Sequence, residues 1–180
     1  MDSLVVDIPD KLFAVAESLS FEGAYALPAL SHCSNEYRFA KPLHYCVQIS
    51  NTGGALYVGG YVEGDATVEC VRCLEETTYH LRGEVEGYFL TPGSDRELTE
   101  EEEDEYEVLP ESHQIDLEPL LRAALMLDMP LSPLCDDNCK GLCPYCGANL
   151  NKETCDCKPE EEPESANPFS VLKTIRFDED

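Results

Sequence analysis

The residues best suited to chemistry in this chain are cysteines, and eight of its ten cysteines fall into four close pairs. The pairs are Cys70 with Cys73, Cys135 with Cys139, Cys143 with Cys146, and Cys155 with Cys157. Two thiolates so close in sequence can bind one tetrahedral Zn²⁺ from a tight turn, and a second pair completes the four ligands. The spacing therefore predicts two closed zinc sites, which stabilise structure and leave no open position for a substrate.

The spacing also favours one division of the pairs between the two metals. Cys143-Pro-Tyr-Cys146-Gly147 has the form of a zinc knuckle, in which glycine lets the chain curl until backbone N–H groups face sulfur. The next pair follows closely, which favours a local site made of Cys143, Cys146, Cys155 and Cys157. The second site then joins distant segments through Cys70, Cys73, Cys135 and Cys139. An exchange of pairs stays open, because Cys139 lies close to Cys143 in sequence.

Thiol redox chemistry is the alternative use of these cysteines. A Cys-x-x-Cys dithiol catalyst usually begins a helix that follows a strand, whereas Cys70 and Cys73 lie between two predicted strands. We therefore favour metal binding over a redox or zinc-delivery protein. Cys33 and Cys46 have no close partner in sequence and are expected to be small buried residues, and His44 and His80 to be strand residues.

Composition indicates the compartment and the class of partner. The first residues lack a basic start and an apolar run, and no later stretch is long and apolar enough to span a bilayer, so we expect a cytoplasmic protein. Thiols stay reduced there, which favours metal binding over disulfides. The formal net charge of −25 repels nucleic acid at long range and attracts basic proteins.

Four of the twelve lysines and arginines flank the cysteine pairs: Arg72, Lys140, Lys152 and Lys158. They either balance the charge of anionic metal–thiolate centres or form a local basic spot that contacts RNA phosphates. Residues 95–107 carry the opposite charge, with nine acids and one arginine. This segment is predicted to be a solvated loop or a docking surface for a cationic partner.

Hydrophobic alternation predicts the strands that position the cysteines, at residues 4–8, 43–49, 55–62, 66–70 and 77–89. Turns are expected at residues 51–54 and 63–65. Residues 11–31 are ambiguous: residues 11–17 could form a short helix, and residues 19–23 could start a strand. Strands joined by tight turns predict an antiparallel meander that can close partly into a barrel. Asp116 is the expected N-cap of a helix whose apolar residues recur from Leu117 to Leu125, and Pro130 ends it.

These elements predict an α+β protein in three parts. Residues 1–130 form the body of antiparallel sheet and helix, and residues 131–158 form a zinc-binding segment packed on it. Residues 159–180 form an acidic linker and a last short helix that begins near Asn167.

The run from Leu131 to Asn151 resembles the YceD family of bacteria and plastids. Further resemblance lies in Cys70-Val-Arg-Cys73-Leu-Glu, in the turn at residues 51–54, and in the ending Asn167-Pro-Phe-Ser-Val-Leu-Lys173. It implies a factor needed for accumulation of large-subunit ribosomal RNA, with genes often beside that of a small basic ribosomal protein. We therefore expect a non-enzymatic factor that binds large-subunit ribosomal RNA, a basic ribosomal protein, or both. A redox or zinc-delivery protein and an acidic chaperone are the alternatives.

Overall fold

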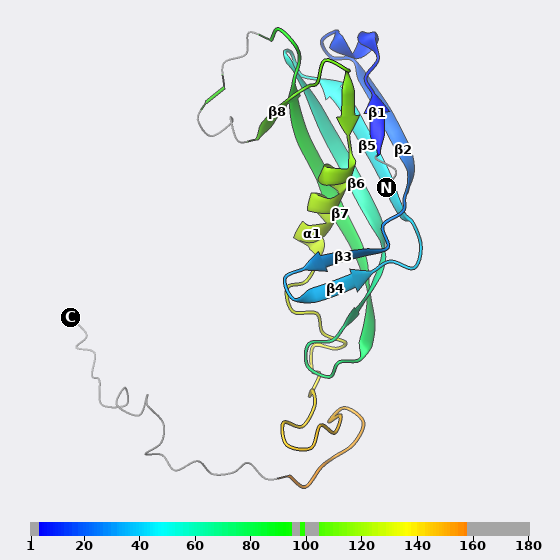
Figure 1. The fold of residues 1–180 in the computed structure, drawn as a ribbon, viewed down its shortest axis with the longest axis vertical. Coiled ribbons are helices and arrows are strands. Elements are labelled where there is room, and N and C mark those ends of the chain that lie inside the picture. The colour runs from blue at the N-terminus through cyan, green and yellow to red at the C-terminus, as the bar shows by residue number, and fades with distance from the viewer. Residues whose placement is uncertain (1–3, 95–97, 100–104, 158–180) are drawn as a thin grey trace, which may run out of the picture. The chain divides into compact units, whose positions relative to one another are not determined.

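The computed structural model describes residues 4–94, 98–99 and 105–157, which belong to two compact units, Met1–Cys139 and Lys140–Asp180. The first unit contains the helix and the named strands (Figure 1). In chain order these are β1 (Val5–Asp7), the 3₁₀ helix η1 (Asp10–Phe13), β2 (Ser18–Tyr25), β3 (Ala29–His32), β4 (Asn35–Arg38), β5 (Leu43–Asn51), β6 (Ala55–Glu69), β7 (Glu76–Leu90), β8 (Tyr106–Val108), β9 (Gln114–Asp116) and α1 (Glu118–Asp128).

One sheet organises this unit. Strands β2, β5, β6 and β7 lie side by side and antiparallel, and β6 pairs with β7 along all fifteen residues of both strands. The hairpin of β3 and β4 joins the far half of β6 through Arg38 and Thr67. The short strand β8 pairs with β7 in parallel. The sheet therefore brings the β6–β7 connection, with Cys70 and Cys73, to its far end.

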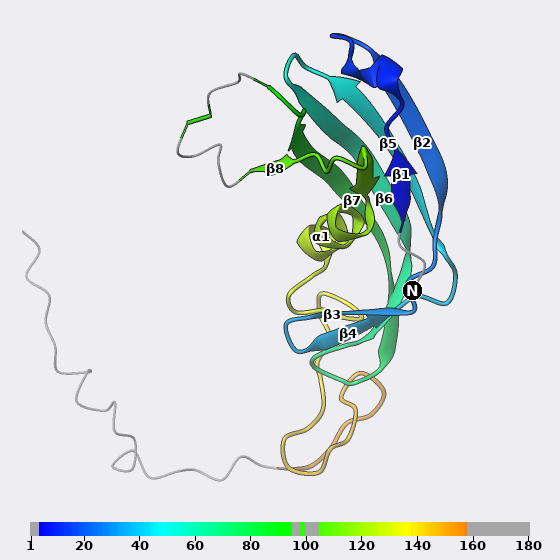
Figure 2. The same cartoon turned by 45° about the horizontal axis from the view of Figure 1, so that its top comes forward.

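The inner face of the sheet carries the core. Figure 2 shows α1 on the concave side of the strands, and a Cβ at Gly83 of β7 would lie 2.3 Å from the carbonyl oxygen of Ala124. Glycine at that position is what lets the helix approach the strand so closely. Helix residues Leu121 and Leu125 and strand residues Leu81 and Val85 are buried there. The two-stranded pairing of β1 with β9 also contributes Ile115 to this core.

The antiparallel arrangement of β5, β6 and β7 was predicted, whereas barrel closure was not confirmed. In the described part of the chain, β2 and β8 each pair on one side only, so the sheet stays open. The parallel pairing of β8 also departs from a pure meander. Tyr106 of β8 lies opposite Tyr88, and β8 runs in the same direction as the end of β7, a pairing that the local sequence does not indicate.

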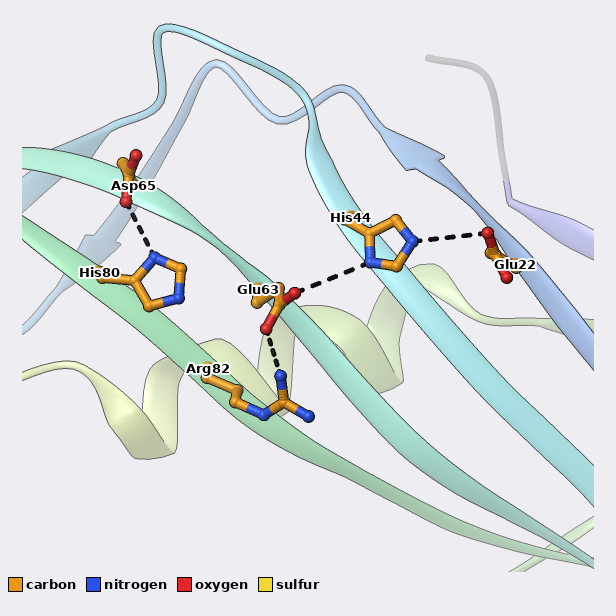
Figure 3. Close-up of polar contacts among 6 residues, drawn as sticks. All are labelled: Glu22, His44, Glu63, Asp65, His80 and Arg82. Carbon is orange, nitrogen blue, oxygen red and sulfur yellow. Dashed lines mark hydrogen bonds and ion pairs between the residues drawn. The ribbon is translucent and has the colours of Figure 1, made fainter.

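The turn expected at residues 63–65 is wrong, because β6 continues through them. Glu63 lies opposite Arg82 of β7 and forms an ion pair with it, and Asp65 accepts a 2.9 Å contact from His80 in the next outward position (Figure 3). Gly64 lies between them and faces inward, where an added Cβ would be 2.5 Å from Leu43 Cδ2. The glycine makes room for packing, and the acids are paired across strands.

The predictions for the N-terminal region, for α1 and for the acidic segment are confirmed only in part. Of the ambiguous N-terminal region, η1 and β2 fit the helix and strand alternatives, while β3 and β4 were not predicted. Helix α1 is confirmed, although Leu117 is its N-cap and Asp116 Oδ1 instead accepts the Glu118 N–H at 3.0 Å. Residues 106 and 107 of the expected acidic loop lie in β8. Residues 95–97 and 100–104 of that loop and the expected C-terminal helix lie outside the described residues.

Candidate metal centres

The first group of cysteines joins two distant parts of the first unit. Cys70 and Cys73 lie in the connection between β6 and β7, and Cys135 and Cys139 follow α1. Cys70 Sγ lies 3.8 Å from Cys139 Sγ, and Cys73 Sγ lies 3.5 Å from Cys135 Sγ. All but Cys135 are buried. These separations are far longer than the roughly 2 Å of a disulfide bond, so none of the four cysteines is disulfide-bonded.

The turn that carries Cys70 and Cys73 is closed by backbone hydrogen bonds. The Leu74 N–H donates to Cys70 O at 2.9 Å, and the Cys70 N–H donates to Glu75 O at 2.9 Å. Leu74 takes a positive φ of 59°, which a residue with a side chain adopts only at an energetic cost. The turn directs both sulfurs toward the segment that follows α1.

The segment between α1 and Cys135 is held in place by hydrogen bonds from the sheet. Tyr79 OH of β7 donates to Leu134 O at 2.6 Å and accepts the Leu134 N–H at 2.8 Å. The Val71 N–H donates to Pro133 O at 2.9 Å, and Tyr37 OH donates to Pro130 O at 2.6 Å. Neither tyrosine was predicted to have this role, because Tyr79 reads as an ordinary strand residue and Tyr37 lies in β4, which the sequence did not indicate.

The second group lies wholly in the second unit and consists of Cys143, Cys146, Cys155 and Cys157. Its first pair sits on a turn with the same hydrogen bonds as the Cys70 turn. The Gly147 N–H donates to Cys143 O at 2.9 Å, and the Cys143 N–H donates to Ala148 O at 2.8 Å. Here the positive φ, 74°, falls on glycine, as the knuckle motif predicted.

Asparagine side chains brace the chain around this second group. Asn151 Oδ1 accepts the Lys140 N–H at 2.7 Å, and Asn149 Oδ1 accepts the Asn151 N–H at 2.9 Å. A bridge between Leu142 and Asn149 closes the loop that contains the knuckle. The motif-based prediction did not include these asparagines, although their side chains often stabilise turns in this way.

Both groups fit a tetrahedral metal. Within each group the four sulfurs all lie within 4.8 Å of one another. Sulfurs bound about 2.3 Å from one Zn²⁺ at tetrahedral angles would lie about 3.8 Å apart, close to the two separations in the first group. The grouping matches the division that sequence spacing favoured, and in the described chain these are the clusters able to hold a metal ion.

The pKa values of the first group show how many of its thiols ionise readily in the absence of a cation. Burial by itself raises the pKa of Cys70, but backbone N–H groups of Cys73, Cys135 and Arg72 face its sulfur and lower that pKa to about 6. Contact with Cys73 and Cys139 raises the pKa of Cys135 to about 12. One thiolate therefore forms readily, and further thiolates beside it are disfavoured. A divalent cation among the sulfurs would reverse that repulsion.

The second group repeats this pattern. Backbone N–H groups of Cys146 and Tyr145 lower the pKa of Cys143 to about 6. Contact with Cys146 raises the pKa of Cys157 to about 12. The same turn thus prepares one thiolate in each group.

The remaining candidate residues are spread over the chain. Arg72, in the first unit, donates from Nη1 to Cys139 O at 2.9 Å. Lys140 and Lys152 belong to the second unit and are exposed, and Lys158 lies outside the described residues. Cys33 is exposed at a positive φ of 54°, contrary to the expected burial, and Cys46 is half-buried. His44 and His80 are strand residues, as predicted.

No helix in the described residues is long and apolar enough to cross a membrane. No solved structure matches the chain. Among curated proteins, the chloroplastic protein of Arabidopsis thaliana called "Large ribosomal RNA subunit accumulation protein YCED homolog 1" is 28% identical over 162 residues, which cover 77% of this chain and 50% of that protein. Its Zea mays counterpart is 26% identical over 144 residues, covering 66% and 49%.

An uncharacterised protein of Mycobacterium tuberculosis is 33% identical over 107 residues, covering 59% of this chain and 51% of that protein. The chain thus spans about half the length of the curated relatives it matches. The family described as "Large ribosomal RNA subunit accumulation protein YceD" matches residues 58–176, a stretch that includes all eight cysteines of the two groups. The chain belongs to the YceD family.

Proposed function

We propose that this protein is a non-enzymatic factor in assembly of the large ribosomal subunit. It binds ribosomal RNA, a basic ribosomal protein, or both, on a scaffold held by two zinc ions. The observation that carries the proposal is the pair of four-thiol groups in a chain of the YceD family. The names of its relatives link that family to accumulation of large-subunit ribosomal RNA.

Zinc is the metal that best suits four thiolates at tetrahedral separations. With four protein ligands each site is filled, so the ions stabilise the chain and bind no substrate. Burial of Cys70, Cys73 and Cys139 supports this role over thiol exchange or zinc delivery, which require accessible sulfur. We place this role in the cytoplasm, where these thiols stay reduced.

Charge favours a basic ribosomal protein, alone or with RNA, over naked RNA. RNA binding draws on lysine and arginine contacts to phosphate, and the chain has twelve such residues against thirty-seven acids. Direct RNA contact would rely on local cations such as Arg72, Lys140, Lys152 and Lys158. A basic protein is attracted by the whole molecule and associates faster at low salt.

Affinity capture of the native protein from growing cells, with RNA and protein identified together, tests this function. We expect precursors of large-subunit RNA and at least one basic large-subunit protein, and loss of both when Cys70 and Cys73 are replaced by serine. Elemental analysis of the purified chain should give about two zinc ions, one per four-cysteine site. A chain without zinc, or a capture without large-subunit components, would contradict the proposal.

A further inference from the structure

The face of the sheet turned away from α1 has a distinctive composition. Along β2, β5, β6 and β7, every second residue faces this side, which we call the outer face. Figure 3 shows six of these residues, among them Glu22, Glu63 and Arg82. Arg82 is its one arginine or lysine in these four strands. Its acids number seven: Glu22, Glu63, Asp65, Glu69, Glu76, Glu84 and Glu86. The outer face is therefore strongly anionic.

Tyrosines cross this anionic face in a row. Tyr57 of β6 lies directly opposite Tyr88 of β7, and Tyr88 lies directly opposite Tyr106 of β8. The ring centroids are 5.2 Å apart for the first pair and 5.1 Å apart for the second. The ring of Tyr57 extends over Gly59, where an added Cβ would approach it to 2.6 Å. This tyrosine row gives the outer face a half-exposed aromatic surface bordered by carboxylates.

The outer face already binds one guanidinium, that of its own Arg82. The Cζ atom of Arg82 lies 3.8 Å from the centroid of the Tyr61 ring, and Nη1 pairs with the carboxylate of Glu63. A tyrosine ring and a neighbouring carboxylate thus hold an arginine from two sides. This is the geometry expected for a cation–π contact reinforced by an ion pair.

The same combination recurs beside the tyrosine row without a cation. Glu86 accepts the hydroxyl of Tyr88, a member of the row, at 2.6 Å. Glu84 is the next outward acid along β7 and lies opposite Tyr61, whose ring Arg82 already covers. Neither acid makes an ion pair with a lysine or arginine in the described part of the chain. A carboxylate that accepts one hydrogen bond keeps further lone pairs for a second donor. Both acids are exposed, so a donor from another molecule can reach them.

We propose that the outer face is the docking surface for a basic polypeptide segment that contains arginine. Its guanidinium groups stack on the tyrosine row and pair with Glu84 and Glu86, as Arg82 does with Tyr61 and Glu63. The proposal rests on the proposed function only in naming ribosomal proteins as the source of the segment. Arg38 of β4 lies beside this face and pairs with Glu69 and Glu76, so seven acids stand against two arginines. The excess of acids makes this face repel RNA phosphates, so RNA is not its ligand.

Arginine suits this surface better than lysine. Guanidinium is planar, weakly hydrated and able to stack on a ring while it donates hydrogen bonds in its plane. Lysine offers a compact, strongly hydrated charge that gains little from stacking. Binding at this face should therefore distinguish two peptides of equal charge, whereas attraction to the acidic chain as a whole should not.

The first test measures binding of two synthetic peptides, alternating arginine–glycine and alternating lysine–glycine, to the purified full chain at physiological ionic strength. Combined Glu84→Gln and Glu86→Gln should weaken the arginine peptide about fivefold, the effect of losing two ion pairs. The matched control is Asp10→Asn with Glu111→Gln, which removes two exposed charges outside the outer face. It should change affinity by about twofold or less, because salt screens distant charges beyond about 8 Å.

The second test separates stacking from charge. Tyr88→Leu should weaken the arginine peptide about threefold and leave the lysine peptide unchanged. Tyr88→Phe keeps the ring and should retain binding, while Tyr145→Leu in the second unit removes an exposed tyrosine and should change nothing. Backbone amide shifts on titration with the arginine peptide should concentrate at the beginning of β6, in the second half of β7 and in β8. Thermal unfolding of each variant verifies that its fold is intact.

Three results would each overturn the proposal. They are an equal loss of arginine-peptide affinity in the outer-face double variant and the control double variant, equal affinity of the chain for the two peptides, and amide shifts spread over the chain. Competition from a large-subunit RNA fragment that shifts the same amides would overturn it too. These measurements use the purified chain alone, whereas the proposed function is tested by capture from cells. A negative result for the peptides therefore contradicts the docking surface alone, and a negative capture result contradicts the proposed function alone.

Discussion

The two cysteine groups contain the same kind of turn but join different parts of the chain. In each turn, the residue that follows the second cysteine, Leu74 or Gly147, has a positive φ, and its N–H donates a hydrogen bond to the carbonyl oxygen of the first cysteine. The N–H of the first cysteine donates to the carbonyl oxygen of the next residue along, Glu75 or Ala148. The groups differ in what they join. Cys70 and Cys139 lie 69 residues apart, on a strand connection and after a helix. The second group lies within residues 143–157.

The pKa of the first thiol in each group is therefore set by its local turn, whereas the stabilising effect of a bound metal depends on which segments the group joins. Each turn lowers the pKa of its first thiol to about 6, because both surround it with backbone N–H groups. Only the first group also closes the long path from β6 through β7 and α1. A metal stabilises the parts of a chain that it connects, so the two groups should contribute to different unfolding events.

The largest expected effect follows from breaking each group separately. Replacing Cys70 and Cys73 by serine should lower the free energy of unfolding of the first unit by about 4 kcal/mol, the chain-entropy value for a loop of this length. Replacing Cys155 and Cys157 by serine should leave that transition in place and remove one metal ion. Denaturant unfolding monitored by circular dichroism, with metal analysis, measures both. Equal responses to the two double variants would show that the division into two groups is wrong.

A smaller effect should come from Tyr79, which has no counterpart in the second group. Tyr79→Phe removes both hydrogen bonds to Leu134 and should destabilise the first unit by about 1–2 kcal/mol. A chelator should then withdraw metal from the first group faster, while the second group keeps its rate. Tyr145→Phe is the control, because that tyrosine is exposed. Unchanged metal release in Tyr79→Phe would mean that the segment before Cys135 is held by other contacts.

A third pair of variants exchanges the residue types at the positive-φ positions of the two turns, Leu74 and Gly147. Leu74→Gly relieves a left-handed backbone at a side chain that is 61% exposed, and should stabilise the first unit by about 1 kcal/mol. Gly147→Leu imposes that strain on the second turn, where an added Cβ meets nothing within 4 Å. It should weaken metal retention in the second group by a similar free energy. Chelator competition measures the second effect and denaturant unfolding the first. A neutral result in both would rule out the shared turn geometry.

The pH dependence should be alike in the two groups. In the metal-free chain, thiolate absorbance should rise first near pH 6, with one thiol per group, because the pKa values of Cys70 and Cys143 lie there. Since these folded-state pKa values lie below the ordinary cysteine pKa of about 8.5, the stability they contribute is complete above about pH 9 and is lost as pH falls through about 6. Cys70→Ser and Cys143→Ser should each remove one early step. A first step only above about pH 8, where free cysteine titrates, would contradict the turn-based explanation.

Features that depend on a few neighbouring residues could be predicted from the sequence. Cysteine spacing and Gly147 specify the second turn, because its hydrogen bonds close within six residues, Cys143 to Ala148. Helical spacing from Leu117 and the stop at Pro130 specify α1 for the same reason. The four-cysteine groups were likewise favoured by spacing, since a tetrahedral metal needs two close pairs.

Features whose partners lie far along the chain could not be predicted from the sequence, because they depend on long-range contacts. Residues 63–65 read as a turn, yet Arg82 and His80 across the sheet pair with Glu63 and Asp65 and make them strand. Tyr79 reads as an ordinary strand residue until α1 brings Leu134 beside it. The outer face emerges in the same way, because strand register alone sets Tyr57 beside Tyr88. Local patterns report backbone preference, whereas these contacts depend on which strands and segments the fold brings together.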